Sequence, residues 1–284
     1  MMAQRSALKR AVPGSLWDLA RNTWYGLGRA AQWPAANLHP LRRASIRWLE
    51  AAKDKHHGER AFIIGNGPSL KQTDLSLLRD EQTFGMNRIY LLFPELGFTT
   101  RYYLSVNSLV VEQCAEDIRA LPMPKFISWR SRGLIQPDSE HRNGSGGKQH
   151  ADAPLVFLHT TYTGPTFATE ATGRLWEGAT VTYVALQLAY HLGFEQVILV
   201  GVDHSFSTIG KANTTVVSQG EDSNHFDPNY FGKGFRWQLP DLETSERAYR
   251  MAREAYAHAG REVLDATIGG QLNVFPKVAY DSLF

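Results

Sequence analysis

Several features are scarce or missing in this 284-residue chain. Cys114 is the single cysteine, so an intrachain disulfide is excluded and a reducing compartment fits best. No stretch approaches the roughly 18 consecutive apolar residues that span a bilayer, and the N-terminus lacks the apolar segment of a secretory signal. We therefore expect a cytoplasmic protein, free or peripheral at the inner face of the membrane, with one large domain and an appendage.

Several signatures of catalysis and ligand binding are also missing. The turn near residue 65 lacks the Gly-Lys-Ser/Thr ending of a Walker loop and the third glycine of a dinucleotide fingerprint. No serine lies in a nucleophile elbow, and Cys114 has no companion. Glu221, Asp222 and His225 lack a diagnostic metal-ligand spacing. We therefore expect no metal cofactor, and no motif indicates a nucleic-acid partner.

The most informative segment present is the turn that follows an apolar run at residues 61–64. Gly65, Asn66 and Gly67 break the run, and Pro68 and Ser69 suit the start of a helix. Free main-chain N–H groups at such a start, together with the helix dipole, bind phosphate or diphosphate groups. The pattern indicates a nucleotide or another phosphorylated ligand. The alternative is an ordinary strand–turn–helix connection in which the glycines serve only the geometry.

Apolar runs alternate with helical patterns from residue 60 onward, and several runs are continuous, as in parallel strands covered on both faces. The expected strands are residues 62–65, 83–86, 102–106, 126–129, 156–159, 197–201 and 262–265. The clearest expected helices are residues 180–192, closed by Gly193, and the segment that Asp241 can cap and Gly260 follows. This order predicts an α/β protein with a doubly wound, mostly parallel Rossmann-like sheet, in which ligands bind beyond the carboxyl ends of the strands.

The N-terminal segment is basic and rich in tryptophan. Its basic residues up to position 49, opposed by Asp18 alone, are Arg5, Lys9, Arg10, Arg21, Arg29, Arg42, Arg43 and Arg47. Its tryptophans are Trp17, Trp24, Trp33 and Trp48. We therefore divide the chain into a basic amphipathic helical arm, residues 1–58, and a Rossmann-like nucleotide-binding and catalytic domain, residues 59–284. The arm suits an anionic membrane surface, or packing against the main domain or a second subunit of a homo-oligomer.

Two long segments interrupt the alternating pattern. Residues 136–154 are polar and glycine-rich, which indicates a mobile surface loop. Residues 205–240 are rich in aromatic side chains, which argues against disorder. Because a long loop in a compact domain is usually functional, we expect residues 205–240 to form a lid over the site.

Polar residues follow several of the expected strands. Asn87 and Asn107 can each bind a ribose hydroxyl or a base edge, or can complete a turn. At the start of the clearest helix, Gly178 allows close approach, and Thr180 and Thr182 can cap the helix or donate to a ligand.

An aspartate and a histidine follow the expected strand at residues 197–201. Asp203 can orient a ligand hydroxyl, coordinate a metal or hold a histidine, or it can cap the following turn. His204 can act as a general acid or base near neutral pH. Both are therefore candidate catalytic residues.

From about residue 60 to its end, the chain resembles the MptE-like proteins, a family named for a 6-hydroxymethylpterin diphosphokinase that includes the Maf flagellin-glycosylation factors. The segments that carry this resemblance are Gly65-Asn66-Gly67-Pro68-Ser69-Leu70 and Val200-Gly201-Val202-Asp203-His204-Ser205-Phe206. The chain is also similar to the bacterial CMP-sialic-acid-dependent sialyltransferases. That similarity runs through Asn66-Gly67-Pro68-Ser69-Leu70-Lys71, Met86-Asn87-Arg88-Ile89-Tyr90, Val106-Asn107, and Leu192-Gly193-Phe194 leading into Gly201-Val202-Asp203.

The sialyltransferase resemblance implies a GT-A-like variant of the fold and a site for the cytidine monophosphate of an activated sugar. The residues it assigns to the nucleotide are Asn66, Gly67, Ser69, Asn87 and Asn107, with Gly65, Pro68, Gly178, Thr180 and Thr182 beside them. Such enzymes invert the anomeric carbon without a metal. They use a histidine base, and tyrosines at the departing phosphate, under a flexible lid.

The same resemblance implies roles for four residues of the expected lid: His225, Tyr230, Lys233 and Arg236. The last three would contact the departing phosphate. The family's base histidine lies just before the last helix, where this chain has Gln238-Leu239-Pro240-Asp241 instead. His225 upstream and His204 both therefore remain candidate bases.

We expect a glycosyltransferase of surface-glycan assembly that transfers a nucleotide-activated sugar, a CMP-linked nonulosonic acid, to a glycan or glycolipid acceptor by inverting displacement. One alternative is the activity that the MptE-like resemblance implies, a pyrophosphokinase that uses ATP and Mg²⁺. The other is a nucleotide-binding protein without catalytic activity.

Overall fold

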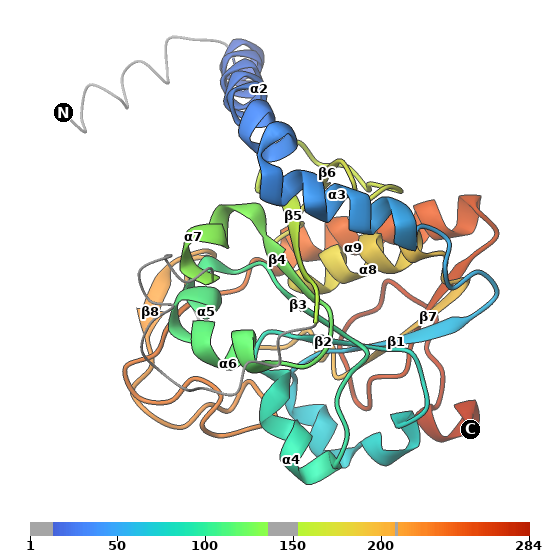
Figure 1. The fold of residues 1–284 in the computed structure, drawn as a ribbon. Coiled ribbons are helices and arrows are strands. Elements are labelled where there is room, and N and C mark those ends of the chain that lie inside the picture. Colours follow the sequence, from blue (N-terminus) through green and yellow to red (C-terminus); the bar gives the residue numbers. More distant parts are fainter. Residues whose placement is uncertain (1–13, 136–152, 208–209) are drawn as a thin grey trace, which may run out of the picture.

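The computed structural model describes residues 14–135, 153–207 and 210–284, with only the backbone for residues 14–19. Its centre is an eight-stranded sheet in which every neighbouring pair of strands is parallel (Figure 1). The strands of this sheet are β1 (Arg60–Ile64), β2 (Thr83–Met86), β3 (Tyr102–Ser105), β4 (Lys125–Ser128), β5 (Leu155–Thr161), β6 (Arg174–Trp176), β7 (Gln196–Val200) and β10 (Glu262–Asp265). Some residues discussed above lie outside the described part of the chain: Arg5, Lys9, Arg10, the side chains of Trp17 and Asp18, and residues 136–152 of the polar loop.

The chain enters the sheet near its middle. β1 is the first strand along the chain. β2 to β6 lie in order on one side of it, and β7 and β10 lie on the other side. β1 and β7 are neighbours, with Ile64 paired to Val200, but their connections lead toward opposite edges of the sheet. Such a topological switch point is where doubly wound proteins bind ligands, beyond the carboxyl ends of the strands.

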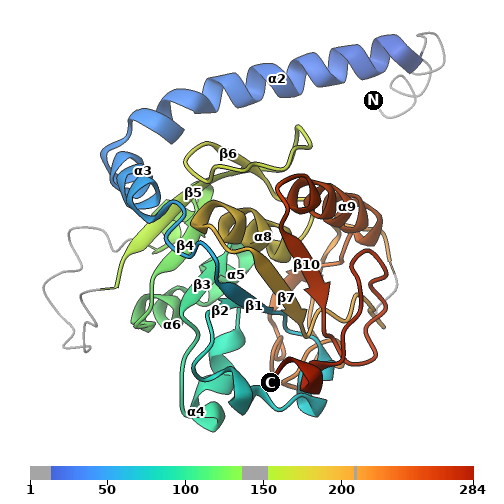
Figure 2. The same cartoon turned by 90° about the vertical axis from the view of Figure 1, so that its right-hand side faces the viewer.

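Helices cover both faces of the sheet, and each face has its own apolar core. α3, α8 and α9 lie on one face, and α4 to α7 lie on the other (Figures 1 and 2). The α-helices are α2 (Gly14–Leu38), α3 (Pro40–Ala52), α4 (Phe93–Leu96), α5 (Ser108–Gln113), α6 (Ala115–Ala120), α7 (Arg132–Ile135), α8 (Val181–Leu192) and α9 (Leu242–His258). Short 3-10 helices lie at Pro68–Gln72, Leu75–Leu78, Ile89–Leu92, Trp129–Ser131 and Tyr280–Leu283. The expected doubly wound α/β class is confirmed.

The strands predicted from the sequence agree with the structure where the strand residues are buried. The seven strands expected from apolar runs all form, and their ends lie within two residues of the expected ones. No apolar run predicts β6, β8 (Thr215–Val217) or β9 (Arg236–Gln238), which have three residues each. β8 and β9 pair in antiparallel fashion, so the expected lid at residues 205–240 is built around a small hairpin.

The caps of the two long helices over the sheet also form as expected. The Thr180 hydroxyl accepts a hydrogen bond from the Thr182 N–H at the start of α8, and Gly193 ends this helix with φ of 98°. The Asp241 carboxylate accepts from the Thr244 N–H at 3.0 Å and begins α9. Each cap supplies a partner for an otherwise unpaired backbone group.

The expected N-terminal arm divides into two parts. α2 runs along the outside of the body and is mostly exposed, although Ala36 near its end is buried, whereas α3 packs on β5 (Figure 2). Ser45 accepts a hydrogen bond from the Phe157 N–H of β5 at 2.9 Å, and Leu49 is fully buried. α3, which belongs to the expected arm, thus buries one side in the core of the main domain, and the boundary at residue 58 stays a prediction.

The basic and aromatic residues of the segment divide in the same way. Arg42 is fully buried, and the half-buried Trp48 packs edge-on against Phe126. On α2, by contrast, Trp24 is 74% and Trp33 55% exposed. Within the described residues, no helix has both the length and the apolar character needed to cross a bilayer.

The division of the arm predicts the effect of two substitutions on α3. Leu49→Ala should lower the free energy of unfolding by about 2–5 kcal/mol, because it leaves a cavity in the core. Arg43→Ala, on the exposed side of the same helix, should change it by about 0.5 kcal/mol or less. Chemical denaturation of the full chain measures both. Equal, small effects would show that α3 is not part of the cooperative body.

Candidate active site

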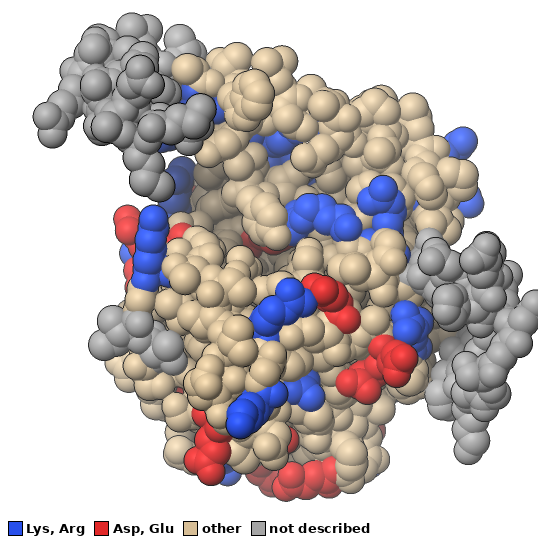
Figure 3. Space-filling model, turned by 90° about the vertical axis from the view of Figure 1, so that its left-hand side faces the viewer, with Lys and Arg blue, Asp and Glu red and all other residues tan. Residues whose placement is uncertain are grey.

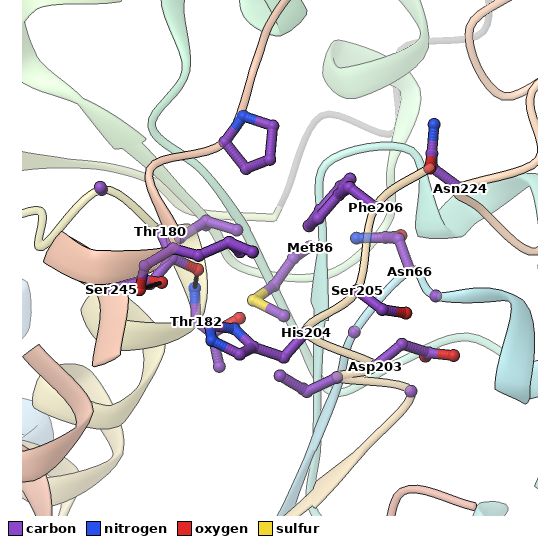
Figure 4. A pocket seen from close by; sticks show the side chains of 18 of the residues that line it. Asn66, Met86, Thr180, Thr182, Asp203, His204, Ser205, Phe206, Asn224 and Ser245 are labelled. Atoms are coloured by element: carbon purple, nitrogen blue, oxygen red, sulfur yellow. Dashed lines mark hydrogen bonds between the residues drawn. The ribbon is translucent and has the colours of Figure 1, made fainter. Parts of the chain in front are cut away.

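A crevice lies at the switch point of the sheet. It has a cavity volume of about 170 Å³. The loops after β1 and β7 and the starts of α8 and α9 form its walls. The polar residues that line it include Asn66, Asn87, Thr180, Thr182, Asp203, His204, Ser205, Asn224, His225, Asp241 and Ser245. In Figure 4, Thr180, Thr182, His204 and Ser245 lie on one side of the pocket, and Asn66, Phe206 and Asn224 lie on the other. We call this pocket the switch-point half.

A second, wider hollow adjoins the first. Residues that line both hollows are Asn87, Ala179, Thr180, Val181, Phe206, His225, Pro240 and Asp241, so the two form one continuous crevice. Aromatic side chains dominate the second hollow: Tyr162, Trp176, Phe206, Phe231 and Trp237. We call it the aromatic half. The space-filling view toward the lid and the carboxyl ends of the strands shows a recess with mainly uncharged walls (Figure 3).

The glycine turn after β1 is held by the loop after β7. The Gly65 N–H donates to Val200 O at 2.7 Å, and the Gly67 N–H donates to Gly201 O at 2.9 Å. Ser69 donates to the Asp203 carboxylate from its N–H at 3.1 Å and from its hydroxyl at 2.7 Å. The expectation that these amides are free for an anion is therefore wrong at Gly65, Gly67 and Ser69.

The same contacts show why this turn needs glycine. A Cβ at Gly67 would lie 1.8 Å from Oδ2 of Asp203, and one at Gly65 would lie 2.2 Å from Gly201 O. Burial raises the pKa of Asp203, although the hydrogen bonds from Ser69 oppose that shift. Pro68 and Ser69 lie beneath the turn and do not line the crevice. Asp203 thus joins the loop after β7 to the turn after β1, and we call this contact with Ser69 the clasp. The structural alternative expected from the sequence was a different one, a cap of the turn that follows Asp203.

Other predicted nucleotide-binding residues do line the crevice. The side-chain oxygen of Asn66 is buried and has no hydrogen-bond partner, so it offers an acceptor to a ligand. Asn87 has a positive φ of 52° and lines both halves. Asn107 lines the aromatic half and also caps α5 through the Leu109 N–H.

Gly178 does not line either half, contrary to expectation. A Cβ there would lie 2.4 Å from that of Ala248, so the glycine allows α9 to pack closely on the turn before α8. The next residue, Ala179, lines both halves and has a positive φ of 60°. The sialyltransferase resemblance includes Ala179 in the turn from Gly178 to Thr182 that it assigns to the donor, but nothing in an alanine signals the left-handed backbone.

His225 occupies the junction of the two halves. Its Nδ1 lies 2.7 Å from Oδ2 of Asp222, and the two side chains are only 13% and 5% exposed. The Asp222 carboxylate also accepts from the Asn224 N–H at 2.9 Å. The ring stacks on Tyr230, with 4.0 Å between ring centroids. An imidazole held in this way presents Nε2 to a substrate, as in a general base oriented by a carboxylate.

His204 is the other candidate base. It lines only the switch-point half, has a positive φ of 56°, and its Nε2 lies 3.4 Å from Oε1 of Glu246. That contact occupies the nitrogen that would otherwise face a substrate. The geometry therefore favours His225 over His204 as a base.

The three residues expected at a departing phosphate lie elsewhere. Tyr230 is 1% exposed and its hydroxyl accepts from the Arg88 N–H. Arg236 pairs with Glu112 at 2.9 Å on the outside of the hairpin. Lys233 is exposed and lines neither half. The expected phosphate contacts are therefore wrong for all three, because the aromatic residues of this segment turn inward as an apolar core and the charged ones face outward.

Asp222 is a partner of His225 that sequence reasoning missed. The signal was present in the spacing, since a carboxylate three residues before a histidine can meet it within one turn. The sequence analysis considered the pair only as metal ligands. Among the residues that the structure describes, no group of three or more His, Cys, Asp or Glu side chains could hold a metal ion.

The electrostatics of the crevice come from helix ends rather than from basic side chains. Among the described residues, no lysine or arginine lines either half. The N-terminal turns of α8 and α9 line it and carry partial positive charge, although Thr180 and the Asp241 carboxylate already cap one N–H group of each helix. The carboxylates of Asp203, Asp241 and Glu177 also line the crevice. A ligand with one phosphate is thus better matched than one with two or three.

No protein-family model matches the chain, and a search of curated proteins found no match. Among solved structures, the chain is similar to the MAf glycosyltransferase from Magnetospirillum magneticum AMB-1, with 15% sequence identity and a TM-score of 0.48. The similarity covers 90% of this chain but 41% of that chain, so this chain spans about two fifths of that protein. The resemblances to the diphosphokinase and to the sialyltransferases stay predictions.

The clasp between Asp203 and Ser69 can be tested by a double-mutant cycle. Asp203→Ala and Ser69→Ala should each lower the free energy of unfolding by about 1–3 kcal/mol, since each leaves a buried partner unpaired. The double variant should lose less than the sum, with a coupling energy of about 0.5–3 kcal/mol. Urea denaturation of the four proteins gives the cycle. Strictly additive losses would mean that the two residues act independently.

Proposed function

We propose that the protein is a glycosyltransferase of surface-glycan assembly that uses a nucleotide-activated sugar. The observation that carries the proposal is the position of His225, where two halves of one crevice meet, with Nδ1 on the buried carboxylate of Asp222. An oriented histidine between two binding regions suits the transfer of a group from a donor in one region to a hydroxyl in the other.

The proposed donor occupies the switch-point half. The starts of α8 and α9 face a phosphate there, and the unpartnered oxygen of Asn66 accepts from a base amino group or a hydroxyl. Since no described basic side chain lines the crevice, a donor with a single phosphate fits best. We therefore propose a CMP-linked nonulosonic acid, in line with the sialyltransferase resemblance of the sequence.

The proposed acceptor is a glycan or glycolipid in the aromatic half. Its rings, including Trp176 and Trp237, offer flat apolar faces, and Asn107 and Gln238 offer amide donors and acceptors beside them. Sugar rings carry both apolar faces and hydroxyl groups, so this combination suits them.

The proposed reaction is an inverting displacement without a metal cofactor. Nε2 of His225 takes the proton of the acceptor hydroxyl, and the oxygen bonds to the anomeric carbon. The bond from that carbon to the phosphate oxygen breaks, and its electron pair leaves with CMP. Asp222 stabilises the imidazolium that forms, and the starts of α8 and α9 stabilise the charge on the leaving phosphate.

A thermal-shift screen of the full chain with CMP, CTP, UDP, GDP, ADP and ATP, each with and without Mg²⁺, tests the donor class. Ligands that bind only the folded state raise the melting temperature. We expect CMP and CTP to stabilise the protein without Mg²⁺. Stabilisation by ATP that requires Mg²⁺ would instead support the pyrophosphokinase activity, and no stabilisation by any nucleotide would refute the proposed function.

Substitution of the two histidines tests the base. His225→Gln should lower kcat by about 10²–10⁴-fold, the range expected for loss of a general base, with the nucleotide-induced thermal shift retained. His204→Gln should have a much smaller effect. Release of CMP from the activated sugar in the presence of glycan acceptors measures kcat. His57→Gln, on an exposed histidine, is the control. Loss of turnover in His204→Gln but not in His225→Gln would assign the base to His204.

A further inference from the structure

A separate pocket lies between α2 and the loop that follows β5. The residues that line it are Trp24, Tyr25, Gly28, Arg29, Gln32, Arg130, Thr160, Thr161, Tyr162 and Thr163. Unlike the crevice, this pocket has basic side chains in its walls. It also touches the crevice, since Tyr162 lines both this pocket and the aromatic half.

Positive charge is concentrated here without matching carboxylates. The guanidinium groups of Arg29 and Arg174 converge, because a Cβ built at Gly164 would lie 3.1 Å from atoms of both. Neither arginine has a carboxylate partner among the described residues; Arg29 donates to the Thr163 hydroxyl at 3.1 Å, and Arg174 donates to Gly164 O at 2.9 Å. Two like charges so close repel each other unless an anion lies between or beside them.

The surroundings of the pocket carry the same sign of charge. Burial first, and then the charges of Arg42, Arg174 and Arg130, lower the pKa of His159 to about 4. Burial first, and then Arg29, lower the pKa of Arg174. Among the described residues, Glu177 pairs with Arg130 at 2.5 Å, which leaves Arg29 and Arg174 without such a partner.

The outer rim of the pocket is aromatic and exposed. Trp24 and Tyr25 are 74% and 41% exposed, and α2 continues this exposed apolar character at Leu27 and Trp33. Tryptophan and tyrosine beside basic residues are typical of a helix at the interface between a bilayer and water.

We propose that this pocket binds the phosphate group of an amphiphilic phosphate ester, with Arg29 and Arg130 in contact with the phosphate and α2 resting on the lipid surface. Arg174 lies behind the pair and adds to the positive potential. Arg130 also stacks on Tyr162, with its guanidinium carbon 4.0 Å from the ring centroid, so a ligand phosphate here lies next to the aromatic half. As the anchor of a lipid-linked acceptor, this site rests on the proposed function.

Vesicle sedimentation with the full chain tests the site. Wild-type protein should bind phosphatidylcholine vesicles that contain phosphatidic acid more tightly than vesicles of phosphatidylcholine alone. Arg29→Gln should weaken this binding about tenfold or more, as expected for loss of a charge-assisted contact to phosphate. Arg43→Gln is the matched control, since it removes the same charge from an exposed position on α3 and should bind as wild type does.

Two further measurements separate the possible results. Inorganic phosphate should compete with the vesicles for wild-type protein but not restore binding of Arg29→Gln. Equal binding by Arg29→Gln and Arg43→Gln would overturn the site in favour of diffuse attraction. Binding of inorganic phosphate without vesicle binding would show that the site takes free phosphate and not a lipid headgroup.

Because Arg29 lies outside the crevice, Arg29→Gln should keep the nucleotide-induced thermal shift. Vesicle binding that depends on Arg29, together with no thermal shift by any nucleotide, would refute the proposed glycosyltransferase activity and leave this phosphate site standing.

Discussion

The contact on which the site depends is the clasp between the loops that follow the two central strands. Asp203, after β7, accepts two hydrogen bonds from Ser69, after β1, and Gly67 leaves room for the carboxylate. The clasp adds to two backbone hydrogen bonds between the same parts of the chain, from the Gly65 N–H to Val200 O and from the Gly67 N–H to Gly201 O. Together these contacts hold the two loops side by side at the floor of the crevice. They also occupy the N–H groups of Gly65, Gly67 and Ser69, so any ligand meets side chains and helix ends there instead.

The segment over the crevice is held by contacts of the same kind. The Phe226 N–H donates to Asn66 O at 3.0 Å, and Arg88 donates to the carbonyl oxygens of Asn229 and Tyr230. Phe226, Tyr230 and Phe231 are buried. The aromatic residues of this segment therefore form a small core of their own, which places His225 at the meeting point of the two halves.

The sequence predicts the sheet well because its parallel strands are buried on both faces and read as continuous apolar runs. It predicts the caps Thr180 and Asp241 because a cap depends on near neighbours. It does not predict which hydrogen-bond partner, distant in the sequence, a polar group meets in the folded chain. The amides of Gly65 and Gly67 look free in the sequence, and only the pairing of β1 with β7 shows that they are used. Likewise, Tyr230 and Arg236 look equivalent in a polar and aromatic loop, but one is buried and the other faces outward.

His225 and the residues that orient it lie in the same segment of the chain, and this has a consequence for how they can move. One segment, residues 205–240, carries the histidine, its partner Asp222 and the stacked ring of Tyr230. By contrast, the loops and helix starts at the edge of the sheet carry Asn66, Asn87 and Thr180. If residues 205–240 moved away from the sheet, the imidazole would therefore leave the crevice together with the carboxylate and the ring that orient it, while the polar residues on the sheet and its helices would stay in place.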